Sequence, residues 1–120
     1  MTRTEKIIAC ARAAHEVNRL WCFAHGDTSH KPWDEAPDWQ KASALNGVEG
    51  VLGGNSPMAQ HEAWSEDKIK NGWAYGPAKD ADRKTHPCLV PYNELSEVDR
   101  MKDTLYIGTV TIVARALGLE

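Results

Sequence analysis

Residues 61–77 read HEAWSEDKIKNGWAYGP, and they lead from a helix into a turn-rich segment. The helix is expected to start at the serine–proline pair 56–57, because a serine hydroxyl caps free amides and proline tolerates the first helical position. Gly72 provides its end, since glycine readily adopts the left-handed conformation that follows many helices. Proline, glycine and polar residues then dominate residues 73–92, which predicts short extended pieces such as a two-stranded ribbon.

Three further helices are expected around this segment. Apolar residues recur at spacings of three and four over residues 4–25, 37–52 and 96–118. The β-branched run 104–113 would also suit a strand, but the serine cap at 96 and the helical spacing favour a helix. The sequence therefore predicts an α+β, mainly α-helical fold, a compact domain with about four helices and short β pieces.

Two glycines interrupt the helix expected over residues 37–52. Gly47 and Gly50 lower its helix propensity, because glycine loses the most backbone freedom on folding. They either allow another element to approach closely or mark a short helix.

The composition is that of an ordinary folded domain. With 120 residues, 42% hydrophobic and 26% charged, the chain is expected to form one domain over residues 1–120. No apolar run approaches the roughly 20 residues of a membrane span, and the N-terminus lacks the pattern of a cleavable secretion signal. The three cysteines show no paired spacing, which favours reduced thiols and a cytoplasmic location. The formal net charge of -3 argues against duplex nucleic acid as a partner.

From His61 onward the chain resembles the RyR repeat, the module of ryanodine receptor calcium channels that also occurs as small stand-alone bacterial and phage proteins. The pattern that carries the resemblance is long and ordered, and it is far more specific than a single short motif. It consists of HEAW at 61–64, Lys68-Ile69, GWAYGP at 72–77, Asp80, Lys84, HPCLVPY at 86–92, Leu95, Lys102-Asp103 and Leu105. Residues 56–118 would form the repeat motif, and residues 1–55 an N-terminal helical extension similar to that of the stand-alone proteins.

The resemblance implies a compact, mainly helical fold, in agreement with the pattern above. Because the channel repeats occur in tandem pairs related by an approximate two-fold axis, a lone repeat is expected to form a homodimer. Repeat pairs can hold an adenine-nucleotide-like ligand against tryptophans in the position of Trp64. Relatives are also associated with sensing or sequestering nucleotide signals, including those of antiphage defence. The resemblance does not imply an enzyme.

The five tryptophans are the first candidate ligand contacts, because a flat indole stacks well on a purine ring. Three of them, which lie on apolar stripes or beside a helix end, are expected to fill the core: Trp21, Trp39 and Trp73. Trp64 lies between His61 and Lys68 on a polar helix face, because residues three and four apart are neighbours. Trp33 lies in a polar loop. Both are as suited to a ligand or an interface as to the core.

A phosphate group would need basic donors, and several lie on the same helix and in the turn that follows it. Acidic side chains nearby almost cancel their charge, so a simple solvated turn remains the alternative. No glycine-rich phosphate loop is present, which excludes hydrolysis by the P-loop route. The candidate ligand-binding residues are Trp64, His61, Lys68, Trp33, Tyr75, Lys79, Arg83, Lys84 and His86.

Catalysis and metal binding have weaker signals. His86 and Cys88 would share one face of a strand, as a Cys–His nucleophile requires, but a buried and inert Cys88 fits the pattern better. The conceivable metal ligands of the N-terminal part are His15, Cys22, His25 and His30. They match no standard zinc spacing, so we expect no metal, no cofactor and no catalytic residue.

Two functions remain. The first is non-catalytic binding of a small nucleotide-derived molecule, such as an adenine nucleotide, an ADP-ribose-type signal or a cyclic nucleotide, by a sensor or a sponge. The alternative is a protein–protein interaction module with an aromatic surface. A concave pocket with convergent donors favours the first, and a flat exposed aromatic patch favours the second.

Overall fold

Four helices and two short strands make up the computed structural model, which describes residues 1–119. The α+β, mainly α-helical prediction is confirmed. In chain order the elements are α1 (Arg3–Ala24), η1 (Trp33–Glu35), α2 (Asp38–Leu52), α3 (Pro57–Lys70), β1 (Ala74–Tyr75), β2 (Thr85–His86), η2 (Tyr92–Glu94) and α4 (Glu97–Ala116). Within these described residues, no helix combines the length and the apolar character that crossing a membrane requires.

The predicted helix ends form as their capping residues dictate. Ser56 accepts a hydrogen bond from the amide of Ala59 at the start of α3, and Ser96 accepts one from the amide of Asp99 at the start of α4. Gly72, with φ 89°, follows α3 in the left-handed region, where a side chain would be strained. The β-branched run 104–113 lies inside α4, because the cap and the helical spacing outweigh the local strand propensity.

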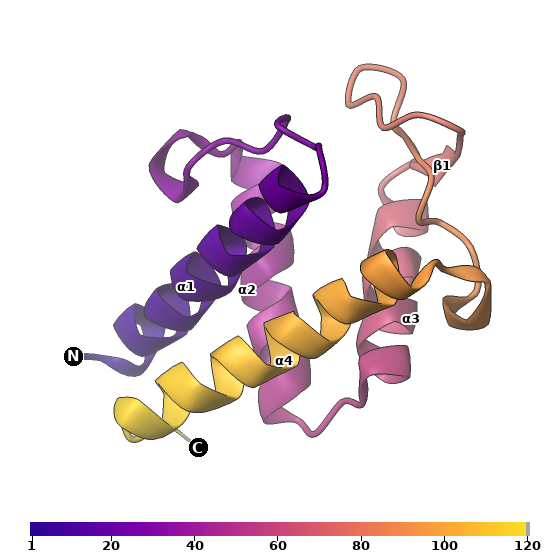
Figure 1. Ribbon diagram of the computed structural model, residues 1–120. Coiled ribbons are helices and arrows are strands. Elements are labelled where there is room, and N and C mark those ends of the chain that lie inside the picture. The colour runs from indigo at the N-terminus through magenta and orange to yellow at the C-terminus, as the bar shows by residue number, and fades with distance from the viewer. Residues whose placement is uncertain (120) are drawn as a thin grey trace.

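Helices α1 and α4 run side by side in opposite directions and cover one face of α2 (Figure 1). Two contacts fix their pairing. The Cys10 thiol reaches the Val110 carbonyl oxygen at 4.0 Å, and the Trp21 indole donates to the Val98 carbonyl at 3.1 Å. Helix α3 packs against α2 and α4 on the other side and leads into the β1–β2 segment (Figure 1).

The apolar core lies between α1, α2 and α4. Its buried members are Ile7, Cys10, Ala11, Ala14, Trp33, Val48, Val110, Ala114 and Leu119. Burial of such side chains removes apolar surface from water and is the main term that stabilises the fold.

Trp33, which the sequence left open between the core and a ligand contact, belongs to this core. Its side chain is only 6% exposed and meets the His15 ring edge-on, with the ring centroids 5.6 Å apart. The physical reason is the short turn η1, which carries the indole inward between α1 and α2. Removing the large apolar surface of the indole from water stabilises this position more than the polar neighbouring residues favour exposure.

The two strands pair in parallel, with Ala74 opposite Thr85 and Tyr75 opposite His86. An antiparallel bridge between Asp80 and Thr85 closes the turn that joins them. The short ribbon expected within residues 73–92 is therefore present, and Lys84 connects it to the end of α3 through a hydrogen bond to the Asn71 carbonyl at 3.0 Å.

Candidate functional site

A cavity of about 490 Å³ opens between the helices on the side where α3 and the ribbon face α1 and α2. Side chains from all four helices and from the segment after β1 line it. Its size lies within the range of small-molecule sites, roughly 300–1,000 Å³.

Aromatic rings form a continuous wall along this cavity. Trp39 of α2 lies against Trp73, with centroids 5.4 Å apart, and Trp73 lies 6.5 Å from His86. The chain of rings continues to Trp64 of α3, whose centroid is 5.0 Å from His86 and 5.6 Å from the stacked ring of His61. Such a wall offers several flat faces to a planar ligand.

Lys68 projects from α3 into the aromatic wall. Its side chain is only 6% exposed, and its ammonium lies 4.6 Å from the ring centroid of Trp39 and 5.4 Å from that of Trp73. Burial lowers the pKa of this amine, because a charge is less stable away from water. The two indoles supply cation–π attraction but accept no ordinary hydrogen bond from it.

Lys79 brings a second amine to the cavity from the turn between the strands. It stays accessible because it faces the open cavity, and the surrounding protein still lowers the pKa of its amine by displacing water. Across residues 1–119, neither Lys68 nor Lys79 forms an ion pair with a carboxylate.

Lys102 and Asp103, two other charged residues that line the cavity, have partners. The Lys102 amine lies 3.0 Å from an Asp99 oxygen, and the His61 ring lies 3.9 Å from an Asp103 oxygen. Burial raises the pKa of Asp103 to about 6 against the opposing charges of His61 and Lys102. Among the lining lysines of residues 1–119, Lys68 and Lys79 therefore have no ion pair, and the Asp67 carboxylate next to Lys68 in the chain lines the cavity without one as well.

Polar side chains form hydrogen bonds between the helices around the cavity. The Tyr106 hydroxyl of α4 donates to the Ala44 carbonyl at 2.6 Å, and the Gln60 amide of α3 donates to the Gly47 carbonyl at 2.8 Å. A Cβ at Gly47 would lie 2.5 Å from the Tyr106 hydroxyl oxygen. Gly47 therefore allows a close approach of α4 to α2, which decides between the two alternatives that its sequence position left open.

His86 and Cys88 do not form an activated Cys–His pair. The Cys88 backbone amide donates a hydrogen bond to Nδ1 of His86 at 3.0 Å, so this ring nitrogen is already used as an acceptor by the backbone of Cys88. Burial raises the pKa of the Cys88 thiol to about 11 and lowers the pKa of His86 to about 4. A thiol of this kind is protonated near neutral pH and is a poor nucleophile.

Five of the nine candidate ligand-binding residues line the cavity: Trp64, His61, Lys68, Lys79 and His86. The other four lie elsewhere. Trp33 is in the core, and Tyr75 projects outward from β1. Arg83 is exposed 3.7 Å from Asp80, and Lys84 donates to the Asn71 carbonyl at 3.0 Å.

All three tryptophans that we expected in the core line the cavity: Trp21, Trp39 and Trp73. Trp39 is 43% exposed, so it is not core, whereas Trp73 is buried with its ring against Trp39 and Lys68. Helical spacing places a side chain on the inner face of a helix but does not distinguish a filled core from a cavity wall. In the sequence, only the high number of tryptophans indicates that some of them line a cavity.

Residues 56–119, from the cap of α3 to the end of the described chain, match the family model of the RyR domain. The chain belongs to the RyR domain family. The matched RyR domain contributes Trp64, Lys68, Trp73, Lys79 and His86 to the cavity. The helices that precede it, α1 and α2, close the cavity with Trp21 and Trp39. The site is therefore shared between the RyR domain and its N-terminal helices.

Proposed function

We propose that this RyR domain protein binds a small nucleotide-derived anion in the cavity and does not transform it, acting as a sensor or a sponge. The observation that carries the proposal is the pair of lysine amines without carboxylate partners beside a wall of tryptophans. A ligand with a flat base and a phosphate would complement both features.

The base is assigned to the tryptophan wall. Stacking on an aromatic side chain contributes about 1–3 kcal/mol per base. Trp39 and Trp64 keep part of their surface open, so each has a face available for such a ring. Trp73 packs against Trp39, with the ring centroids 5.4 Å apart.

The phosphate is assigned to Lys68 and Lys79. A buried ammonium without a counter-charge is unfavourable, and a phosphate that entered the cavity would remove this cost. Hydrogen bonds between charged groups are stronger than neutral ones, at about 1.5–3 kcal/mol. The raised pKa of the Cys88 thiol also favours binding over nucleophilic chemistry.

The test is a calorimetric titration with AMP, ADP, ADP-ribose and cyclic AMP. We expect at least one of them to bind in a salt-sensitive manner, and Lys68→Met to weaken binding by about 10- to 100-fold. Arg83→Met is the control, because Arg83 is exposed beside Asp80 and does not line the cavity. Absence of binding to all four, or equal losses in both variants, would contradict the proposal. Native mass spectrometry of the protein purified from cells that produce candidate signals would identify the natural ligand.

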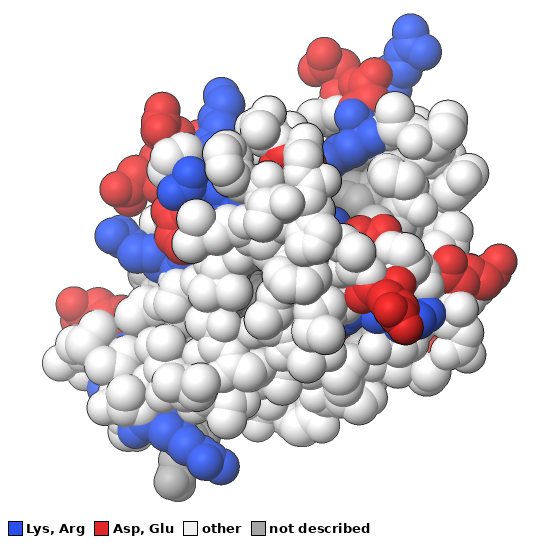
Figure 2. Space-filling view, in the orientation of Figure 1, with Lys and Arg blue, Asp and Glu red and all other residues white. Residues whose placement is uncertain are grey.

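We also propose that the protein forms a homodimer through the face crossed by α1 and α4. Large apolar side chains are exposed on these helices, including Leu20, Phe23 and Ile112, the last at 70%. Figure 2 shows charged side chains around the rim of this face and a broad uncharged area between them. Light scattering at tens of micromolar should give twice the mass of the chain, and a strictly monomeric mass would contradict the dimer.

The same exposed side chains favour the second candidate function, a protein–protein interaction module. The titration above separates the two, because an interaction module would bind none of the four nucleotides.

A further inference from the structure

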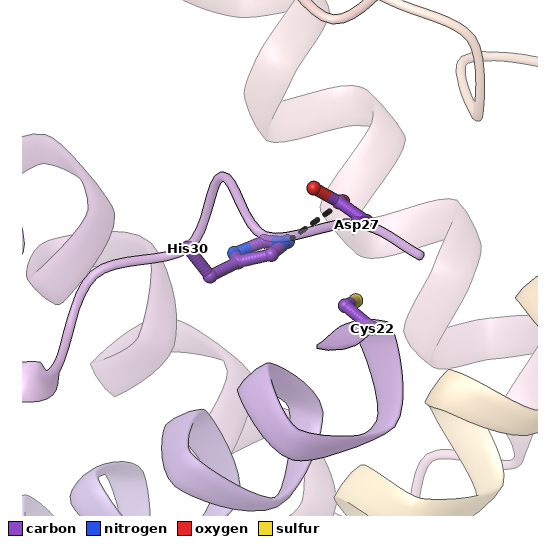
Figure 3. A group of neighbouring side chains, drawn as sticks. All are labelled: Cys22, Asp27 and His30. Atoms are coloured by element: carbon purple, nitrogen blue, oxygen red, sulfur yellow. Dashed lines mark ion pairs between the residues drawn. The ribbon is translucent and has the colours of Figure 1, made fainter. Parts of the chain in front are cut away.

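A cluster of three different metal-ligand types lies at the end of α1 and in the loop that follows it. Cys22, Asp27 and His30 each place a ligand atom within 4.8 Å of the other two. Figure 3 shows the three side chains converging, with the His30 ring and the Asp27 carboxylate drawn as an ion pair. The Nε2 of His30 lies 3.5 Å from Oδ2 of Asp27.

His30 is poorly satisfied where it lies. Its side chain is only 10% exposed, and its sole polar contact in residues 1–119 is the long one to Asp27. The second ring nitrogen, Nδ1, is buried without a hydrogen-bond partner in this described part of the chain. Nδ1 therefore lacks the partner that buried polar groups nearly always have, and Nε2, which faces Asp27 without a close hydrogen bond, is the nitrogen free to bind an ion in the cluster.

The neighbours of the cluster hold its ligand atoms in place. The Asp27 Oδ1 atom accepts hydrogen bonds from the amide of Ser29 at 2.9 Å and from its hydroxyl at 2.6 Å, which leaves Oδ2 directed toward His30. The Cys22 thiol is oriented by a 3.8 Å contact with the side-chain oxygen of Asn18. Outer contacts of this kind are typical of metal sites, where they fix the ligands.

We propose that Cys22, Asp27 and His30 bind a zinc ion at the edge of the cavity. A thiolate with an imidazole selects zinc over magnesium or calcium, which prefer oxygen ligands alone. Three protein ligands leave one tetrahedral position, and all three residues line the cavity, where water or an anion can supply the fourth ligand. Bonds of about 2.0–2.3 Å require the widest separation in the cluster to shorten by roughly 1 Å.

Charge balance defines how the ion would bind. The thiol of Cys22 must lose its proton, so each Zn²⁺ forms one Zn–S bond and releases one proton to the solvent. The thiolate and the Asp27 carboxylate then neutralise the dication. The amines of Lys79 and Lys102 act on the cluster from across the cavity and oppose a cation, so binding is expected to be weaker than in a four-ligand structural site.

This site departs from the sequence-based expectation of no metal. That expectation grouped Cys22 and His30 with His15 and His25 and rejected the spacing. In the structure His15 instead contacts the Lys31 carbonyl, at 2.6 Å, and His25 contacts the Trp21 carbonyl, at 2.7 Å. The third ligand is Asp27, which the sequence had not indicated.

The experiment uses Co²⁺ as a spectroscopic substitute and Zn²⁺ competition with a chromophoric chelator, both on the full chain without nucleotide. We expect one equivalent of Co²⁺ to give a thiolate-to-cobalt charge-transfer band and tetrahedral ligand-field bands. Calorimetry in two buffers should show release of one proton per Zn²⁺. Neither readout depends on the proposed anion, so failure of one proposal leaves the other intact.

Matched variants locate the site. Cys22→Ser and His30→Gln should abolish the thiolate band and weaken Zn²⁺ binding by at least about 10-fold. Cys88→Ser, another cavity cysteine, and His25→Gln, a neighbouring histidine, should leave both unchanged. Loss in the control variants, or binding that survives Cys22→Ser, would overturn the assignment.

A measurement on the unaltered protein tests the zinc site even when the variants fail to fold. Zn²⁺ should slow alkylation of Cys22, as mapped by mass spectrometry of its peptide, and leave the rate at Cys88 unchanged. Equal alkylation of Cys22 with and without Zn²⁺ would overturn the proposal.

Discussion

Two sides of the molecule use tryptophan in opposite ways: the side that holds the core between α1, α2 and α4, and the side where α3 and the ribbon face α2. On the first side Trp33 is enclosed by apolar neighbours and contributes to a filled core. On the second side Trp39, only a few residues away in sequence, stays 43% exposed beside the unpaired amine of Lys68. The comparison shows that the fold is completed on one side, while the other keeps open aromatic surface and uncompensated charge. Open aromatic surface and uncompensated charge are typical of a ligand-binding site.

The largest expected effect tests the filled side. Trp33→Ala should lower the free energy of unfolding by about 3–5 kcal/mol, because it leaves a large cavity in the core. Trp39→Ala should cost less than about 1.5 kcal/mol, because its indole is already partly in water. Urea denaturation of the two variants measures both values. Similar losses in both would remove the distinction between the two sides.

The next effect tests the open side. Lys68→Met keeps the length of the side chain but removes the charge, so the free energy of unfolding should stay the same or rise by about 1 kcal/mol. The affinity for a nucleotide anion should fall by about 10- to 100-fold in the same variant. Thermal unfolding and calorimetry measure the two quantities on one sample. A variant that loses stability and keeps its affinity would show that Lys68 supports the fold rather than the ligand.

The helices could be predicted from the sequence. Which tryptophans are buried in the core and which line the cavity could not. Caps such as Ser56 and Ser96 act on amides three residues away, so their effect can be read locally. Whether Trp33 or Trp39 is enclosed depends on how η1 and α2 meet elements far along the chain. That information is absent from the spacing of apolar residues.

The charged residues show the same limit. Lys79, Arg83 and Lys84 look equivalent in the sequence because they belong to one polar turn. The structure directs Lys79 into the cavity, while Arg83 faces Asp80 and Lys84 meets the Asn71 carbonyl. The turn geometry, with the strained φ of 56° at Lys84, decides which amine faces inward.

A pH-dependent effect follows from the burial of His86. Burial lowers the pKa of His86 to about 4, whereas the unfolded chain protonates this residue near its ordinary value of about 6.5. Between these two values the unfolded state binds more protons, so this residue makes the fold less stable as pH falls, by about 1–2 kcal/mol at pH near 5.

Asp103 acts in the opposite direction, because its raised pKa of about 6 lets the folded state bind the extra proton. The variant His86→Gln isolates the histidine contribution. Its free energy of unfolding should fall less than that of the parent protein between pH about 7 and 5, as measured by urea denaturation at both values. Identical losses would show that His86 is protonated in the folded state.

Two glycines on facing helices test how closely α2 and α4 approach each other. Gly47→Ala should destabilise the protein by about 1–3 kcal/mol, because the new Cβ would meet the Tyr106 hydroxyl at 2.5 Å. Gly108→Ala on α4 should stabilise it by about 0.5–1 kcal/mol, since nothing lies within 4 Å of that position and alanine favours the helix. Melting temperatures of the two variants should therefore move in opposite directions. A shift in the same direction would mean that α2 and α4 are not in close contact at Gly47.

If the proposed function is right, the aromatic wall, and not the core, contacts the ligand. The most direct measurement is the set of five tryptophan indole N–H signals in a proton–nitrogen NMR spectrum, assigned by single Trp→Phe variants and followed during titration with AMP and ADP-ribose. We expect the signals of Trp39, Trp64 and Trp73 to shift with ligand concentration while that of Trp33 stays in place. Signals that all remain unchanged, or a Trp33 signal that moves as far as those of the wall, would contradict the proposed function.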